Sequence, residues 1–160
     1  MPESPDPTER SLWRPLHLLL AAMDRDIAQL YVERGVTGLR PRYVLPLVRL
    51  ARRGPMTIRQ LAESVGVTHS AMSQTVGAMR REGLVHSVPG GGDARTREVA
   101  LTQQGRGLVP LMEAEWEATE QALADLEAEL PYPMSQVVRD VQAALERRSF
   151  HDRIAEALDL

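Results

Sequence analysis

Two adjoining helix signals lie in the stretch "TIRQLAESVGVTHSAMSQTVGAMRREG", residues 57–83 of this 160-residue chain. Thr57 and Gln60 form a T-x-x-Q capping box, in which the threonine caps a backbone N–H and the glutamine reaches back to the cap. Gly66 ends this first short helix, and Thr68 is a suitable cap for the next one. Because only Gly66 and Val67 separate the two helices, the stretch predicts a helix-turn-helix.

The second of these helices has two different faces. Met72, Thr75, Val76 and Met79 recur at helical spacing and predict the face that packs on a core. The opposite face carries short polar side chains, with two arginines near its C-terminal end, and such side chains suit base edges with phosphates nearby. A solvated helix face has a similar composition, so both interpretations stay open for this helix alone. The candidate DNA-binding residues here are His69, Ser70, Ser73, Gln74, Arg80 and Arg81.

The next stretch, "GLVHSVPGGGDARTREVALT", residues 83–102, predicts a β-hairpin. Apolar alternation flanks a turn-forming cluster at Pro89–Gly92. A hairpin directly after a helix-turn-helix is a wing, and Arg97 on its second strand is a further candidate for DNA binding. A phosphate-binding loop is excluded, because the Walker motif requires a lysine, which this chain lacks, and the third glycine of G-x-G-x-x-G is missing. The glycines therefore serve to turn the backbone.

Charge is distributed unevenly along the chain. Residues 41–110 contain ten arginines and four acidic residues, a net charge of +6, whereas the rest contains nine arginines and eighteen acidic residues, a net charge of -9. A basic middle segment between acidic flanks favours a polyanion as its partner.

Apolar stripes with helical spacing lie on both sides of the basic segment, at residues 11–40 and 111–160. They can pack on the middle of the same chain or on another copy. Long helices outside a compact domain leave much apolar surface to bury, which favours the second copy and predicts a homodimer. The residues predicted for dimerisation are Leu12, Leu16, Leu19, Trp116, Leu123, Leu126, Val138 and Leu145.

Several classes of site and location are unsupported by the sequence. Residues 1–10 are acidic, rich in proline and without an apolar run, so they predict a flexible N-terminus and not a signal or an anchor. No apolar run approaches the roughly 20 residues that span a bilayer. The chain has no cysteine, and its four histidines lack ligand spacing, so we expect no metal and no cofactor. We expect a cytoplasmic protein without a membrane partner.

Nearly the whole chain, from the long N-terminal helix onward, resembles the MarR (multiple antibiotic resistance regulator) family of winged-helix transcription factors. The resemblance rests on the helix-turn-helix and on a D-x-R pattern followed by V-x-L-T-x-x-G, here Asp93, Arg95, Val99, Leu101, Thr102 and Gly105. It implies a homodimer that places two recognition helices in successive major grooves of a pseudo-palindromic operator. It also implies that Arg95 enters the minor groove and that Asp93 orients it.

The sequence departs from this family pattern at three positions. Many members carry basic residues where Ser87 and Val88 stand, and arginine or lysine where Gln74 stands. The family often binds small aromatic or anionic effectors between the dimer helices and the DNA-binding domain. Trp13, His17, Tyr31 and Tyr43 lie on segments that line such a site in this resemblance, although each also suits packing or the surface.

The expected fold is mainly α with a small β-hairpin: a winged helix-turn-helix DNA-binding domain at residues 41–110, flanked by dimerisation helices at 11–40 and 111–160. The expected function is that of a dimeric, sequence-specific regulator of transcription, acting as a repressor, with a possible small organic effector. The alternative is a winged-helix protein–protein adaptor that does not bind DNA. No grouping of serine, histidine and acid suggests an enzyme.

Overall fold

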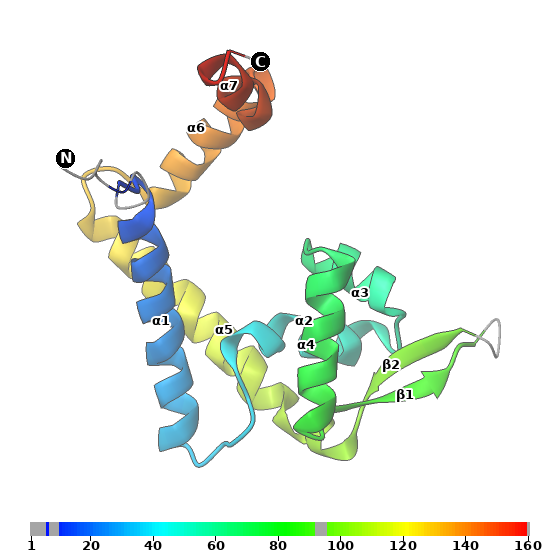
Figure 1. Ribbon diagram of the computed structural model, residues 1–160. Coiled ribbons are helices and arrows are strands. Elements are labelled where there is room, and N and C mark those ends of the chain that lie inside the picture. The colour runs from blue at the N-terminus through cyan, green and yellow to red at the C-terminus, as the bar shows by residue number, and fades with distance from the viewer. Residues whose placement is uncertain (1–5, 7–9, 92–95, 160) are drawn as a thin grey trace. The chain divides into compact units, whose positions relative to one another are not determined.

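The computed structural model describes residues 6, 10–91 and 96–159 (Figure 1). In this part of the chain the fold is mainly α, with a two-stranded antiparallel sheet, which confirms the expected fold class. The elements are, in order, α1 (Arg14–Glu33), α2 (Pro41–Arg53), α3 (Ile58–Val65), α4 (His69–Arg81), β1 (Val85–Pro89), β2 (Arg97–Leu101), α5 (Gln103–Glu129), α6 (Met134–Arg147) and α7 (Phe150–Ala157).

The chain forms two compact units, Met1–Glu113 and Ala114–Leu160, and helix α5 runs from the first into the second. The first unit contains the helix-turn-helix, the hairpin and most of the buried apolar residues. The second contains the rest of α5 and the helices α6 and α7. None of the helices described is long and apolar enough to cross a membrane.

The helix-turn-helix forms as its capping residues predict. The Thr57 side chain accepts the Gln60 amide N–H, and the Gln60 side chain accepts the Thr57 amide N–H, so the capping box at the start of α3 is complete. Gly66 ends α3 in the left-handed conformation that glycine adopts without strain. Thr68 then caps α4 through the Ala71 amide. Both predicted helices and the joint between them are confirmed.

The core of the first unit depends on a helix that the sequence pattern did not reveal. Helix α2 begins at Pro41 and keeps Pro46 inside it, yet it buries an apolar face. Proline at the first helical position needs no N–H partner, which makes it a good starting residue. The core joins α2 to α3, α4, the strands and the start of α5, and it includes Tyr43, Val44, Leu47, Leu50, Leu61, Met72, Val76, Met79, Leu84, Val99 and Met112.

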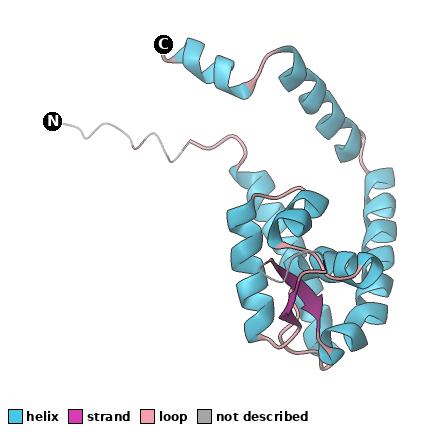
Figure 2. Cartoon of the chain, turned by 90° about the vertical axis from the view of Figure 1, so that its right-hand side faces the viewer, coloured by secondary structure: helices cyan, strands magenta, loops and turns pink. Residues whose placement is uncertain are grey.

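The hairpin is held at its base by a third segment of chain. Strands β1 and β2 pair from Val85 opposite Leu101 to Pro89 opposite Arg97, and the Gly90 amide donates to the Thr96 carbonyl. On the other edge of β2, Met56 and Val99 exchange two backbone hydrogen bonds. Figure 2 shows the two strands in magenta against the cyan helices. The wing is therefore attached to the turn that joins α2 and α3.

Thr102 and Gly105 tie the end of the wing to the turn after α4. The Thr102 hydroxyl donates to the Gly83 carbonyl at 2.6 Å, and it accepts the Gly105 amide at 3.0 Å. The Thr102 amide also donates to the Leu84 carbonyl at 3.0 Å. A Cβ on Gly105 would lie 2.2 Å from that same carbonyl oxygen, so only glycine fits there. The T-x-x-G part of the motif therefore has a structural role.

The C-terminal apolar pattern after Pro133 forms two helices, α6 and α7. Ser149 caps α7 through the Asp152 amide, and this cap requires an extended residue that interrupts the helix. The Arg153 guanidinium then donates to the Ala144 and Arg148 carbonyls at the end of α6. The two helices are therefore separated at residues 148–149.

Helices α5 and α6 are joined by an unusual cap. Pro133, at the start of α6, offers no side-chain cap. Instead, the Glu127 carboxylate accepts both the Ser135 amide and the Ser135 hydroxyl, the latter at 2.8 Å. These two bonds lower the pKa of Glu127 below its usual range, the amide bond more than the hydroxyl bond. A negative charge at the N-terminus of a helix is also favoured by the helix dipole.

Candidate nucleic-acid interface

Helix α4 presents its polar face to solvent and its apolar face to the core. Met72, Val76 and Met79 are buried, and Thr75 is half-buried at the edge between the two faces. The predicted contact residues of the opposite face are all exposed, and they begin in the first turn of the helix: His69, Ser70, Ser73 and Gln74. Short side chains on an exposed helix face permit close approach to base edges in a major groove.

Two predicted arginines meet at Ser87, in the middle of β1. The Arg80 guanidinium donates to the Ser87 hydroxyl at 2.8 Å, which links α4 to β1. Arg97, at the start of β2, donates to the Ser87 carbonyl at 3.4 Å. Both arginines remain exposed at the surface. Position 87 is neutral in this chain, but two guanidinium groups from neighbouring elements supply positive charge around it.

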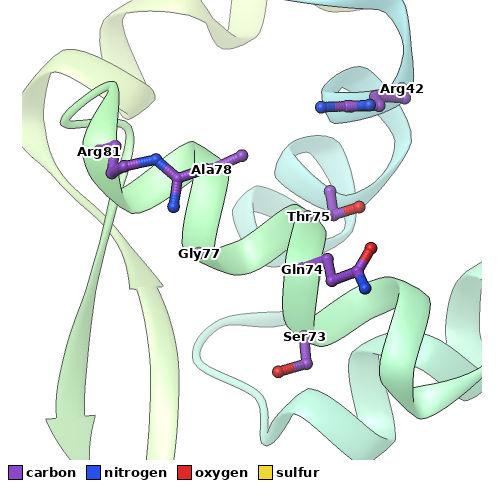
Figure 3. Close-up of a pocket in the computed structure, with 7 residues that line it drawn as sticks. All are labelled: Arg42, Ser73, Gln74, Thr75, Gly77, Ala78 and Arg81. Atoms are coloured by element: carbon purple, nitrogen blue, oxygen red, sulfur yellow. The ribbon is translucent and has the colours of Figure 1, made fainter.

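A hollow of about 550 Å³ lies beside α4. One of the residues that line it, Arg42, was not among the candidates predicted from the sequence. Figure 3 shows Arg42 on the segment that begins α2, whereas the other labelled residues belong to α4. The Arg42 guanidinium lies 5.3 Å from the centre of the Tyr43 ring, an arrangement that helps to hold it in place. The residues that line the hollow are Arg42, Ser73, Gln74, Thr75, Gly77, Ala78 and Arg81.

Two residues assigned to the wing tip, Asp93 and Arg95, lie outside the described part of the chain. Their roles in orienting a guanidinium and entering a minor groove stay predictions. The described strands reach Pro89 and Arg97 on either side of them.

Apart from Leu12, which precedes α1, the residues predicted for dimerisation lie on helices of the single chain, at exposed or half-buried positions. Leu12, Leu19, Trp116, Leu126, Val138 and Leu145 are exposed, whereas Leu16 and Leu123 are half-buried. Further large apolar side chains are exposed on α1, α6 and α7, among them Leu18, Leu20, Val137, Phe150 and Ile154.

The four aromatic and histidine residues weighed as lining for an effector site divide into two pairs. Tyr31 and Tyr43 are buried in the core of the first unit, with 2% and 1% of their surface exposed. Trp13 and His17 are exposed. In the described residues, histidine and acidic side chains form no group of three that could hold a metal ion.

A helix-turn-helix followed by a two-stranded hairpin defines the winged-helix class of DNA-binding folds. The model of the MarR family matches residues 35–96, which include both helices of the helix-turn-helix and the first strand of the wing. This segment is therefore similar to the MarR family, which confirms the resemblance seen in the sequence. No curated protein matches the chain.

Solved structures of transcriptional regulators share the fold. A probable transcriptional regulator from Pseudomonas aeruginosa is 25% identical with a TM-score of 0.55, and the match covers 84% of this chain and 99% of that one. MepR from S. aureus, solved with DNA, is 16% identical with a TM-score of 0.64, covering 86% and 98%. MosR from M. tuberculosis, also solved with DNA, is 21% identical with a TM-score of 0.60, covering 94% and 100%.

Proposed function

We propose that the protein is a homodimeric, sequence-specific DNA-binding repressor of transcription that acts in the cytoplasm. The observation that carries this proposal is the exposed polar face of α4 with arginines from three elements around it. Arg42 belongs to α2, Arg80 and Arg81 to α4, and Arg97 to β2. The family matched by residues 35–96 regulates transcription, and MepR and MosR were solved in complexes with DNA.

The contacts divide into two kinds by their chemistry. Hydroxyl and amide groups of α4, above all Ser70, Ser73 and Gln74, read base edges in the major groove. The arginines bind phosphates, or the narrow minor groove in the case of Arg95, and supply affinity that depends on salt. Two copies related by a two-fold axis then require half-sites about one helical turn apart.

The first test measures binding to a duplex from the DNA upstream of this protein's own gene and to a scrambled duplex, at several salt concentrations. Arg95→Ala is expected to weaken binding by about 1–3 kcal/mol per dimer and to flatten the salt slope by about 1 or 2 units. Gln74→Ala is expected to change the preferred bases with little effect on the salt slope. Unchanged affinity of the Arg95 variant for the operator would mean that the wing does not touch DNA.

The alternative function, a protein–protein adaptor, is favoured by the neutral residues Gln74, Ser87 and Val88. An adaptor needs no affinity for nucleic acid. Binding of the unmutated protein to a random duplex at low salt separates the two functions, because phosphate contacts alone produce non-specific binding. Failure to bind any duplex at low salt would support the adaptor and refute the repressor.

A small organic anion controls the repressor in this proposal. The Nε atom of Arg49 in α2 is buried and has no hydrogen-bond partner among the described residues. A buried donor without an acceptor is costly, and a bound carboxylate would satisfy it.

The corresponding experiment screens aromatic carboxylates for a raised melting temperature of the free protein and weaker binding to the operator duplex. Arg49→Met, which keeps an unbranched apolar stem, is expected to lose the response to the carboxylate while retaining DNA binding. If no carboxylate changes either quantity, the protein is a constitutive repressor.

A further inference from the structure

Gly77 lies in the middle of α4 although the fold does not require a glycine there. Glycine within a helix costs about 1 kcal/mol relative to alanine. Its backbone is not in the left-handed region, since the glycines with positive φ are Gly35, Gly38, Gly54, Gly66 and Gly83. A Cβ added to Gly77 would meet only the Arg81 guanidinium, at an ordinary contact distance of 3.8 Å. Alanine therefore fits the isolated protein and would stabilise it.

Gly77 lines the hollow beside α4, and its lack of a side chain leaves space there. The other lining residues carry basic, hydroxyl and amide groups. Arg42 and Arg81 contribute guanidinium groups, and Ser73 and Thr75 contribute hydroxyls. Among the described residues, none of those that line the hollow is acidic. Arg42 comes from a different helix than the others, so the hollow joins α2 to the exposed face of α4 (Figure 3).

We propose that this hollow is the binding site of a DNA backbone phosphate, which Arg42 and Arg81 bind. Gly77, which has no side chain, lets the sugar–phosphate chain approach α4. A phosphate oxygen pair matches the planar fork of a guanidinium, and the Thr75 hydroxyl donates to the remaining oxygen. A Cβ at residue 77 would stand where the backbone of the duplex lies. The inference rests on the proposed DNA-binding function and adds Arg42 and Gly77 to its interface.

The decisive variant is Gly77→Ala, with Gly107→Ala as its matched control. Gly107 is an exposed residue of α5, and a Cβ there meets nothing within 4 Å. Both variants are expected to keep or raise the melting temperature, because both remove a helical glycine. Only Gly77→Ala is expected to weaken duplex binding, by roughly ten- to a hundredfold, since it displaces the phosphate from its charged donors. Equal duplex binding by the two variants would refute the proposed phosphate-binding site.

Arg42→Ala tests whether the charge of Arg42 contributes to the phosphate-binding site. Arg53→Ala, at the other end of α2, is its control. Removing a phosphate contact is expected to weaken binding to the operator duplex and to the scrambled duplex equally. It is also expected to lower the slope of affinity against salt concentration by about 1 per protomer. The control removes the same charge outside the hollow and is expected to leave the slope unchanged. If Arg42→Ala alters neither the affinity nor the salt slope while the unmutated protein binds the duplex, the proposed phosphate-binding site is refuted and the proposed function stands.

Free phosphate is the other source of the same chemistry. Melting of the unmutated protein in sodium phosphate and in sodium chloride at equal ionic strength distinguishes the two sources. Phosphate stabilises proteins generally because it is excluded from their surface, so a site for DNA predicts that the unmutated protein and Arg42→Ala gain the same rise in melting temperature from phosphate. Specific stabilisation by phosphate that Arg42→Ala abolishes, together with unchanged duplex binding of that variant, would assign the hollow to a free phosphate group. An unmutated protein that binds no duplex at low salt refutes the proposed function itself.

Discussion

Replacing Gly105 with alanine is expected to destabilise the winged-helix unit by about 3 kcal/mol. The new Cβ would lie 2.2 Å from the Leu84 carbonyl oxygen and 3.2 Å from its carbon. That carbonyl cannot move away freely, because it accepts hydrogen bonds from the amide and the hydroxyl of Thr102. The overlap therefore has to be relieved by breaking those bonds or by displacing α5 from the turn after α4.

Urea unfolding measures this effect, and Gly107→Ala in the same helix is again the control. Alanine at the control position meets no neighbouring atom, so it is expected to stabilise the protein by about 0.5–1 kcal/mol. The two variants should therefore shift the unfolding midpoint in opposite directions. A Gly105→Ala protein as stable as the unmutated one would show that Thr102 and Leu84 do not hold the joint.

Replacing both Leu123 and Leu126 with glutamate is expected to dissociate the proposed homodimer, or to unfold it. Leu126 is exposed in the single chain and Leu123 is half-buried, and both belong to the apolar stripe of α5. Burying two carboxylates in an apolar interface carries a large desolvation cost, which opposes association. Operator binding falls with dissociation, because a monomer holds only one half-site.

Sedimentation of the variant and of the unmutated protein measures the oligomeric state. Ala118→Glu with Ala128→Glu is the control, because it adds the same two charges on the opposite side of α5, at exposed residues. The control is expected to remain dimeric. A monomeric unmutated protein of normal stability would refute the dimer, and a dimeric Leu123/Leu126 variant would place the interface elsewhere.

Local signals in the sequence predicted the helix-turn-helix and the wing. Thr57, Gln60 and Thr68 act on backbone groups within one turn, so their effect can be read without knowledge of the rest of the fold. The alternation around Val99 and Leu101 has the same local character. These are the parts of the fold for which hydrogen bonding and periodicity decide the structure.

The features that were missed depend on tertiary packing or on signals that compete. Helix α2 contains Pro46 in its interior, which usually argues against a helix, and burial of its apolar face outweighs that signal. The Ser149 cap that divides α6 from α7 interrupts a continuous apolar stripe. Arg42 reaches the hollow beside α4 because α2 packs on α4. The sequence of residues 41–53 alone does not indicate that α4 is the neighbouring helix.

The bridge between Met56 and Val99 has a mechanical consequence. Val99 hydrogen-bonds to Met56 on one edge of β2, while the strand pairs with β1 on its other edge. A load applied to the outer half of the hairpin is therefore carried through β2 into the turn before α3, and not absorbed by bending of the hairpin alone. The wing is therefore joined by backbone hydrogen bonds to the turn before α3, so that a tilt of the wing acts on the start of α3.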